Sequence, residues 1–163
     1  MSRRPKGSYV RNTPDWFVNR LCFGSGQVNG GSGGAGLSIQ LYNDTNVGEY
    51  LYLYGLWVND SNSEQLFAQV SQGQVGSAFQ KCYSVVGGRA TPAGLVNTGA
   101  TPAGADLINQ PLTWQGNQPT APILSQFPLA VIPPTYGFTI YNGFSAAAII
   151  ASFWYVTLMD QVA

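Results

Sequence analysis

Histidine is absent from this chain of 163 residues, and only two of its residues are cysteine. Histidine is the commonest general acid or base and the commonest metal ligand, so most schemes of acid–base and nucleophilic catalysis lose their usual partner. The chain also contains no P-loop and no Gly-x-Ser-x-Gly motif. We therefore expect no enzyme activity and no catalytic, cofactor-binding or metal-binding residues. A carboxylate pair that converges only in the folded chain is the one enzymatic alternative left open.

The two cysteines, Cys22 and Cys82, are too far apart in the sequence to form a metal-ligand spacing. We expect both to be buried free thiols. A disulfide between them is the alternative, because two cysteines alone do not indicate the redox compartment.

Charge is scarce along most of the chain. Charged residues make up 9% of the sequence, whereas about a quarter is usual. Between Arg89 and Asp160 the only charged residue is Asp106. A surface with so little charge is expected to be covered extensively by other protein.

Basic residues are concentrated at the N-terminus, where five of the seven lie within the first 20 positions. We interpret this segment as an arm that docks on an acidic protein surface or on nucleic acid, with a solubilising tail as the alternative. The expected arm contacts are Arg3, Arg4, Lys6, Arg11, Trp16 and Phe17. Outside the arm only Lys81 and Arg89 are basic, so we expect no nucleic-acid partner for the rest of the chain.

Neither a signal peptide nor a membrane span is expected. No uninterrupted apolar run follows the basic start, as a secretory signal would require. The longest apolar run, residues 146–159, is shorter than the roughly 20 residues that a membrane-spanning helix needs.

Glycine makes up more than half of residues 24–36. A segment of this composition cannot form a packed core, so we interpret it as a flexible tether. The predicted organisation is a basic arm and tether over residues 1–36, followed by one β-sandwich domain over residues 37–163.

Apolar and aromatic residues recur with a period of two through this domain, which is typical of strands. The expected strands are residues 37–42, 50–58, 66–70, 79–85, 112–114, 129–132, 137–141 and 146–159. Asn142-Gly143 predicts a tight hairpin turn between the last two strands. The near-repeat ATPAGLVNTG and ATPAGADLIN, which starts at Ala90, is interpreted as a long extended loop.

Two of these strands are apolar on both faces, where a sandwich exposed to water should alternate apolar and polar side chains. The simplest second cover is a neighbouring subunit, so we expect a homo-oligomer, with a trimer favoured. The expected interface residues are Tyr50, Tyr52, Tyr54, Ile150 and Trp154. Cross-strand packing and stacking against sugar rings are the alternatives for the tyrosines.

The motifs LAVIPPTYGFTIYN and ASFWYV, with LSIQLYND and YLYLYGLWVND upstream, resemble small β-sandwich virion proteins of tailed bacteriophages. The resemblance covers about Leu37 to Met159. It implies an all-β, antiparallel β-sandwich fold that is jelly-roll-like, with an extended N-terminal arm and long loops. It also implies a protein located in the virion that assembles with itself and with other virion proteins such as the major capsid protein, without catalysis.

The expected function is therefore that of a virion structural protein, either a capsid decoration (cement) protein or a fibre-base subunit. One alternative is a small jelly-roll capsid protein whose arm contacts nucleic acid. Another is a carbohydrate-binding or receptor-binding module that stacks sugars on Tyr50, Tyr52, Tyr54 or Trp57.

Overall fold

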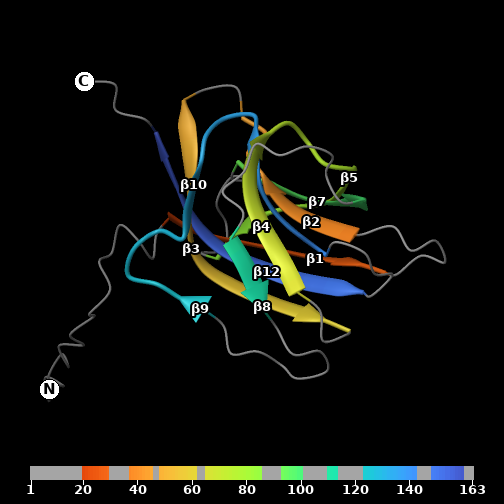
Figure 1. The fold of residues 1–163 in the computed structure, drawn as a ribbon. Coiled ribbons are helices and arrows are strands. Elements are labelled where there is room, and N and C mark those ends of the chain that lie inside the picture. Colours follow the sequence, from red (N-terminus) through yellow and green to blue (C-terminus); the bar gives the residue numbers. More distant parts are fainter. Residues whose placement is uncertain are drawn as a thin grey trace, which may run out of the picture.

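The computed structural model describes residues 20–29, 37–45, 48–61, 65–85, 93–100, 110–113, 123–142 and 148–159. Within these residues all the elements are β-strands, which confirms the all-β prediction (Figure 1). The strands are β1 (Leu21–Val28), β2 (Leu37–Tyr42), β3 (Glu49–Asp60), β4 (Gln65–Gln72), β5 (Ser77–Lys81), β6 (Tyr83–Ser84), β7 (Leu95–Ala100), β8 (Gln110–Thr113), β9 (Ile123–Leu124), β10 (Ala130–Ile132), β11 (Tyr136–Asn142) and β12 (Ile149–Met159).

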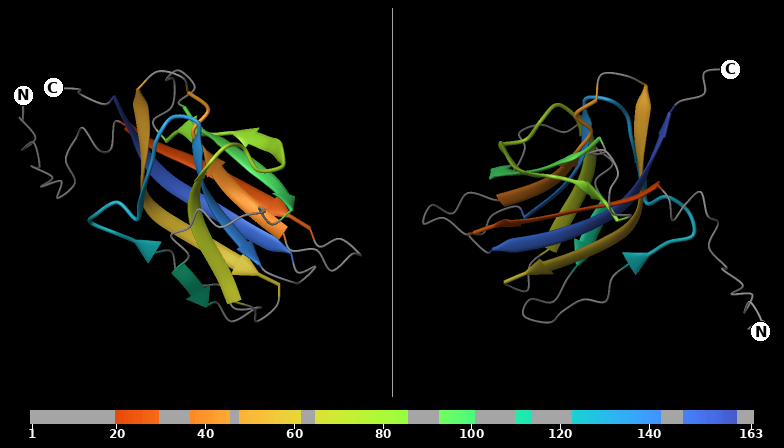
Figure 2. Two further views of the ribbon diagram at one scale, coloured as in Figure 1. Left: turned by 45° about the horizontal axis from the view of Figure 1, so that its top comes forward. Right: turned by 180° about the vertical axis from the view of Figure 1, so that it is seen from behind.

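The strands form two antiparallel sheets that pack face to face (Figure 2). Sheet A has the order β10-β3-β12-β1-β6, with β9 also paired to β3, and sheet B has the order β5-β7-β2-β11-β4-β8. Apolar side chains of both sheets fill the space between them. The largest fully buried ones are Tyr155, Phe153, Ile39, Leu41, Leu51, Leu53, Leu66, Ile132, Ile140 and Ile149.

Eight of the strands are connected as a jelly roll. In chain order these are β1, β2, β3, β4, β8, β10, β11 and β12, and they pair as first with last, second with seventh, third with sixth and fourth with fifth. This pairing gives the half-sheets β10-β3-β12-β1 and β2-β11-β4-β8. Two sheets of four strands with this nested connectivity are the jelly-roll fold. The predicted jelly-roll-like β-sandwich is confirmed.

The other strands extend this framework at its edges. The chain between β4 and β8 contributes β7 beside β2, β5 beside β7, and β6 beside β1. The prediction of a long loop through the ATPAG near-repeat is therefore wrong for Leu95–Ala100, which is β7. The strand expected at residues 79–85 is interrupted at Cys82, which separates β5 from β6.

The predicted boundary at residue 37 is also wrong, because β1 lies well inside the sandwich. It pairs with β12 along its whole length, from Leu21 opposite Val156 to Val28 opposite Ile149. Its glycines are explained by packing: a Cβ added at Gly24 would lie 2.5 Å from the Cys82 sulfur, and one at Gly26 would lie 2.6 Å from a Val96 methyl carbon. Glycine at these positions allows β6 and β7 to approach β1 closely.

The hairpin predicted at Asn142-Gly143 is not formed. β11 pairs with β2 and β4 in sheet B, whereas β12 pairs with β3 and β1 in sheet A, so the chain changes sheets between them. The buried Asn142 side chain instead accepts a hydrogen bond from the Leu37 backbone N–H, at 2.6 Å. The Pro-Pro corner before β11 is a turn in which the Tyr136 N–H bonds to the Pro133 oxygen, with Thr135 at a φ of 65°.

Candidate assembly surface on sheet A

The outward face of sheet A collects most of the residues predicted to form an interface. Residues directly opposite each other in an antiparallel pair project from the same face. Ile150 lies opposite Asn59, Trp154 opposite Gly55, and Leu158 opposite Tyr50. The neighbouring core-facing residues of β12 are fully buried, whereas Ile150 and Trp154 are only partly buried.

A bulge in β3 extends this outward face. The pairing of β3 with β12 shifts where Gly55 lies opposite Trp154 and Leu53 lies opposite Tyr155, which leaves Tyr54 as the extra residue. Before the bulge Leu51 and Leu53 face the core, and after it Leu56 and Val58 do so. The bulge therefore moves the outward positions from even to odd numbers, as a single inserted residue must. Tyr50 and Tyr52 precede it and Trp57 follows it, all partly exposed.

Three aromatic rings form a row across neighbouring strands of this face. Phe23 of β1 lies opposite Tyr83 of β6 on one side and Trp154 of β12 on the other. The ring centroids are 5.3 Å apart for Phe23 and Tyr83 and 5.1 Å apart for Phe23 and Trp154, with tilted planes in both pairs. Tilted aromatic pairs at this separation each contribute about 0.5–1.5 kcal/mol beyond the area that they bury. We call these three residues the aromatic row.

Sequence patterns identified Trp154 but missed Phe23 and Tyr83. The predicted arm and tether, residues 1–36, include Phe23, although β1 shows a readable alternation: Cys22, Gly24 and Gly26 face inward, while Phe23 and Ser25 face outward. Tyr83 could not be assigned, because its position depends on a break in the strand at Cys82.

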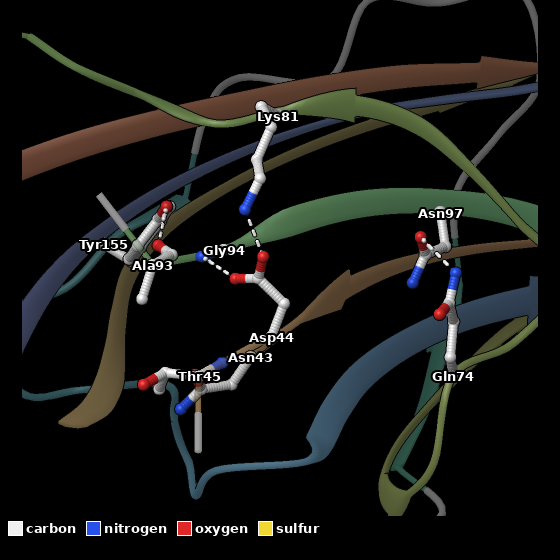
Figure 3. A network of polar contacts seen from close by, with 9 residues as sticks. All are labelled: Asn43, Asp44, Thr45, Gln74, Lys81, Ala93, Gly94, Asn97 and Tyr155. Carbon is white, nitrogen blue, oxygen red and sulfur yellow. Dashed lines mark hydrogen bonds and ion pairs between the residues drawn. The ribbon is translucent and has the colours of Figure 1, made fainter. Parts of the chain in front are cut away.

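The outward positions of sheet A carry no charged side chain among the residues that the structure describes. Asp44 and Lys81 pair with each other, and Asp44 also accepts a hydrogen bond from the Gly94 N–H at 2.7 Å (Figure 3). Arg20 and Glu49 are the chain neighbours of the outward positions Leu21 and Tyr50. Because successive residues of a strand alternate between its two faces, neither is at an outward position. A face without basic side chains does not provide the phosphate contacts that nucleic acid requires.

The outward side of sheet B differs, because the chain itself covers it with polar groups. Gln40, Asn97 and Thr139 are fully buried there. The Gln40 amide donates to the Thr139 hydroxyl and to the Gly73 oxygen, both at 3.1 Å, and its oxygen accepts from the Asn97 amide at 3.1 Å and from the Val75 N–H at 2.9 Å.

Gln74, in the same β4–β5 connection, donates to the Asn97 oxygen at 3.2 Å (Figure 3). The β4–β5 connection thus supplies hydrogen-bond partners to Gln40 and Asn97 of sheet B. This side of sheet B also carries partly exposed rings, Phe67 and Tyr141, whose centroids are 5.5 Å apart, so the two sheets differ in the buried polar network and not in aromatic content alone.

The buried thiols and phenol at the other side of β1 do not form a reactive site. Cys22 and Cys82 are both free and buried, as expected. Burial raises the pKa of the Cys82 thiol to about 11 and raises the pKa of the Tyr155 phenol well above its ordinary value. Because the thiolate is the nucleophilic form, a thiol with a raised pKa is unreactive near neutral pH.

Within the described ranges no group of three or more Cys, Asp and Glu side chains could hold a metal ion. In the same ranges no helix is long and apolar enough to cross a membrane. The predicted arm contacts, Arg3, Arg4, Lys6, Arg11, Trp16 and Phe17, lie outside the described residues.

Comparisons of the chain with protein-family models, with curated proteins and with solved structures gave no match.

Proposed function

We propose that this chain is a non-enzymatic structural subunit of a virion that assembles with copies of itself through the outward face of sheet A. The observation that carries the proposal is a jelly roll in which one sheet is apolar on both faces. Jelly rolls build viral capsid proteins, and they also occur in lectins and cupins, so the virion part of the proposal is an argument by fold analogy.

Self-assembly has a physical basis in the outward side chains of sheet A. Ile150, Trp154 and Tyr52 are large and partly exposed. Trp154 and Tyr52 are diagonal neighbours across β12 and β3, and Ile150 lies on the same face of β12, four residues from Trp154. Removing one such side chain fully from water contributes about 1.5–3 kcal/mol. Several such side chains per subunit are needed to offset the cost of bringing copies together, which is about 4–15 kcal/mol.

The position of β1 favours a shell-forming capsid protein over a decoration protein. The basic segment ends at Arg20, and the next residue begins β1, a strand of the sandwich itself, so no long tether separates the two. Basic residues joined directly to the shell domain suit contact with packaged nucleic acid. A decoration or fibre-base subunit would instead use Trp16 and Phe17 to dock on the major capsid protein.

Expression of the chain alone, followed by electron microscopy and sedimentation, tests this proposal. Closed particles would support the shell-forming role. Small oligomers that bind preformed shells, and lose this binding when residues 1–19 are deleted, would support the decoration role. A monomer that binds glycans through the Tyr50 face would overturn both.

A further inference from the structure

The large apolar side chains that are exposed in the described part of the chain fall into two groups. One group lies on β5, β6 and the residue after β6, and the other lies between β9 and β10 and on β10 itself. Their exposed fractions are 50% for Phe79, 52% for Tyr83 and 49% for Val85 in the first group, and 78% for Phe127, 39% for Leu129 and 40% for Val131 in the second.

Two members of the first group, Tyr83 and Val85, lie at the β6 edge of sheet A, whereas Phe79 lies on β5, the edge strand of sheet B. Tyr83 is the outer end of the aromatic row and packs against Phe23. Val85 continues the β6 pairing, since its N–H bonds to the Leu21 oxygen at 2.9 Å. The edge thus presents an apolar strip that runs on into the partly exposed Trp154.

The second group lies on a short loop that projects from the opposite edge of the same sheet. β9 and β10 both pair with β3, at Gly55–Leu56 and at Leu51–Leu53, so the chain between them leaves the sheet beside Tyr54. This loop, residues 125–129, stands out from the body between β9 and β10 in Figure 1, and the same cyan loop projects in Figure 2.

Hydrogen bonds hold both ends of the projecting loop. The Ser125 N–H bonds to the Tyr54 oxygen at 3.0 Å, and the Leu129 N–H bonds to the Leu53 oxygen at 2.6 Å. The Phe127 N–H bonds to the Ser125 hydroxyl at 3.2 Å. Phe127 is therefore an exposed aromatic ring on an anchored loop, and its ordering cost on binding is low.

We propose that these two groups are the two halves of one contact, in which the Phe127 loop of one copy packs on the aromatic row of the next copy. The contact joins opposite edges of sheet A head to tail, so successive copies can close into a ring. In such a ring every subunit has both groups covered, whereas a foreign partner would cover only one. This inference rests on the self-assembly part of the proposed function.

The size and charge of the face fit a second copy of the chain. The strands of sheet A, spaced by about 4.8 Å and rising about 3.3 Å per residue, give a face of roughly 20 by 26 Å over the eight residues of β1. This footprint of roughly 500 Å² is below the ~800 Å² per partner that standard specific interfaces bury, and the projecting Phe127 loop adds to it. Neither group contains a charged side chain, so no like-charge repulsion opposes the contact.

Crosslinking between two tagged single-cysteine variants tests the arrangement. Phe127→Cys on one copy and Tyr83→Cys on the other are mixed and treated with a short bis-maleimide. We expect a mixed dimer that carries both tags, and little self-crosslinking of either variant alone. The wild type is the control, because its own thiols Cys22 and Cys82 are buried. The double variant should give covalent rings of a single size.

Two outcomes would overturn the inference in distinguishable ways. Oligomers that crosslink through Phe127→Cys alone, or not at all, would show that the copies meet elsewhere, and self-assembly would stand. A wild-type chain that sediments as a monomer at micromolar concentration would contradict both this head-to-tail contact and the proposed self-assembly. As a second measurement, Phe127→Ser should shift sedimentation towards the monomer with an unchanged circular dichroism spectrum, whereas Gln126→Ala in the same loop should leave the oligomer intact.

Discussion

The hydroxyl of Tyr155 donates a hydrogen bond to the backbone oxygen of Ala93, at 2.7 Å (Figure 3). Tyr155 belongs to β12, the last strand of the jelly roll, and Ala93 precedes β7 in the chain inserted between β4 and β8. This bond therefore ties the insertion to the centre of the sandwich, and the packing around it gives two predictions.

The first prediction concerns the bond itself. Tyr155→Phe keeps the ring but leaves the partly buried Ala93 oxygen without this donor. We expect a loss of about 1–3 kcal/mol in the free energy of unfolding, which is the usual cost of an unpaired buried polar group. Urea unfolding measures it, with Phe substituted for the partly exposed Tyr136 as the control. An equal loss in both variants would contradict the role of the bond.

The second prediction concerns Gly94, beside Ala93. Its φ is 125°, and an added Cβ would lie 2.3 Å from the Tyr155 hydroxyl oxygen. Gly94→Ala combines this overlap with a backbone conformation that costs an L-residue about 1–3 kcal/mol. We expect severe destabilisation. Tyr155→Phe in the same chain should remove part of the overlap, so the double variant should be more stable than the sum of the single losses predicts. Additive losses would show that the backbone conformation alone matters.

The third prediction is a loss of stability at high pH. In the folded chain the Cys82 thiol has its pKa raised from 9.0 to about 11, chiefly by burial. Between these values the unfolded chain releases this proton while the folded chain keeps it, so the folded state binds more protons and stability falls as pH rises. The contribution of Cys82 is complete below pH 9 and is lost by about pH 11.

Urea unfolding at several pH values between 8 and 11.5 measures the effect. The loss attributable to one thiol is on the order of 2–3 kcal/mol, because each pH unit corresponds to about 1.4 kcal/mol per proton. Cys82→Ala should flatten the decline over this range. Tyr155, whose pKa burial also raises, keeps its contribution to the decline above pH 10 in that variant. An unchanged pH profile in Cys82→Ala would contradict the prediction.

Sequence patterns predicted the strands of the sandwich well where apolar side chains alternate on one face, as in β2, or occupy both faces, as in β3. They failed at β1, because glycine there serves close packing: the space beside Gly24 is filled by Cys82, which is 58 positions away. Local composition cannot show such a neighbour, which is why glycine content alone predicts a flexible tether at these residues.

Local sequence patterns also could not predict which strands pair with each other. Asn-Gly favours a tight turn whichever strands flank it, but the pairing of β11 with β2 and β4 depends on nonlocal contacts of the whole jelly roll. Only part of the proposed assembly surface could be predicted, because the rest depends on nonlocal contacts. The alternation in β12 identified Ile150 and Trp154, whereas Tyr83 and Phe127 reach their positions through connections that have no periodic pattern.

The last prediction separates the two faces of β12 by substitutions at neighbouring positions. Ile149 and Phe153 are fully buried between the sheets, whereas Ile150 and Trp154 project from the outward face and are only partly buried. Replacing Ile150 and Trp154 with Ser should leave the fold intact and separate the copies, because the part of these side chains that is still exposed in the single chain is buried in the assembly. Replacing Ile149 and Phe153 with Ser should unfold the chain, since each large-to-small change in a core costs about 2–5 kcal/mol.

Sedimentation measures the assembly and circular dichroism measures the fold in both double variants. The matched pairs share a strand and a substitution type, so a difference between them reports the face and not the chemistry of serine. If Ile150→Ser with Trp154→Ser also unfolds the chain, the outward face of sheet A is an internal surface covered by the chain's own segments. If that variant stays folded and assembles like the wild type, the copies meet through another surface.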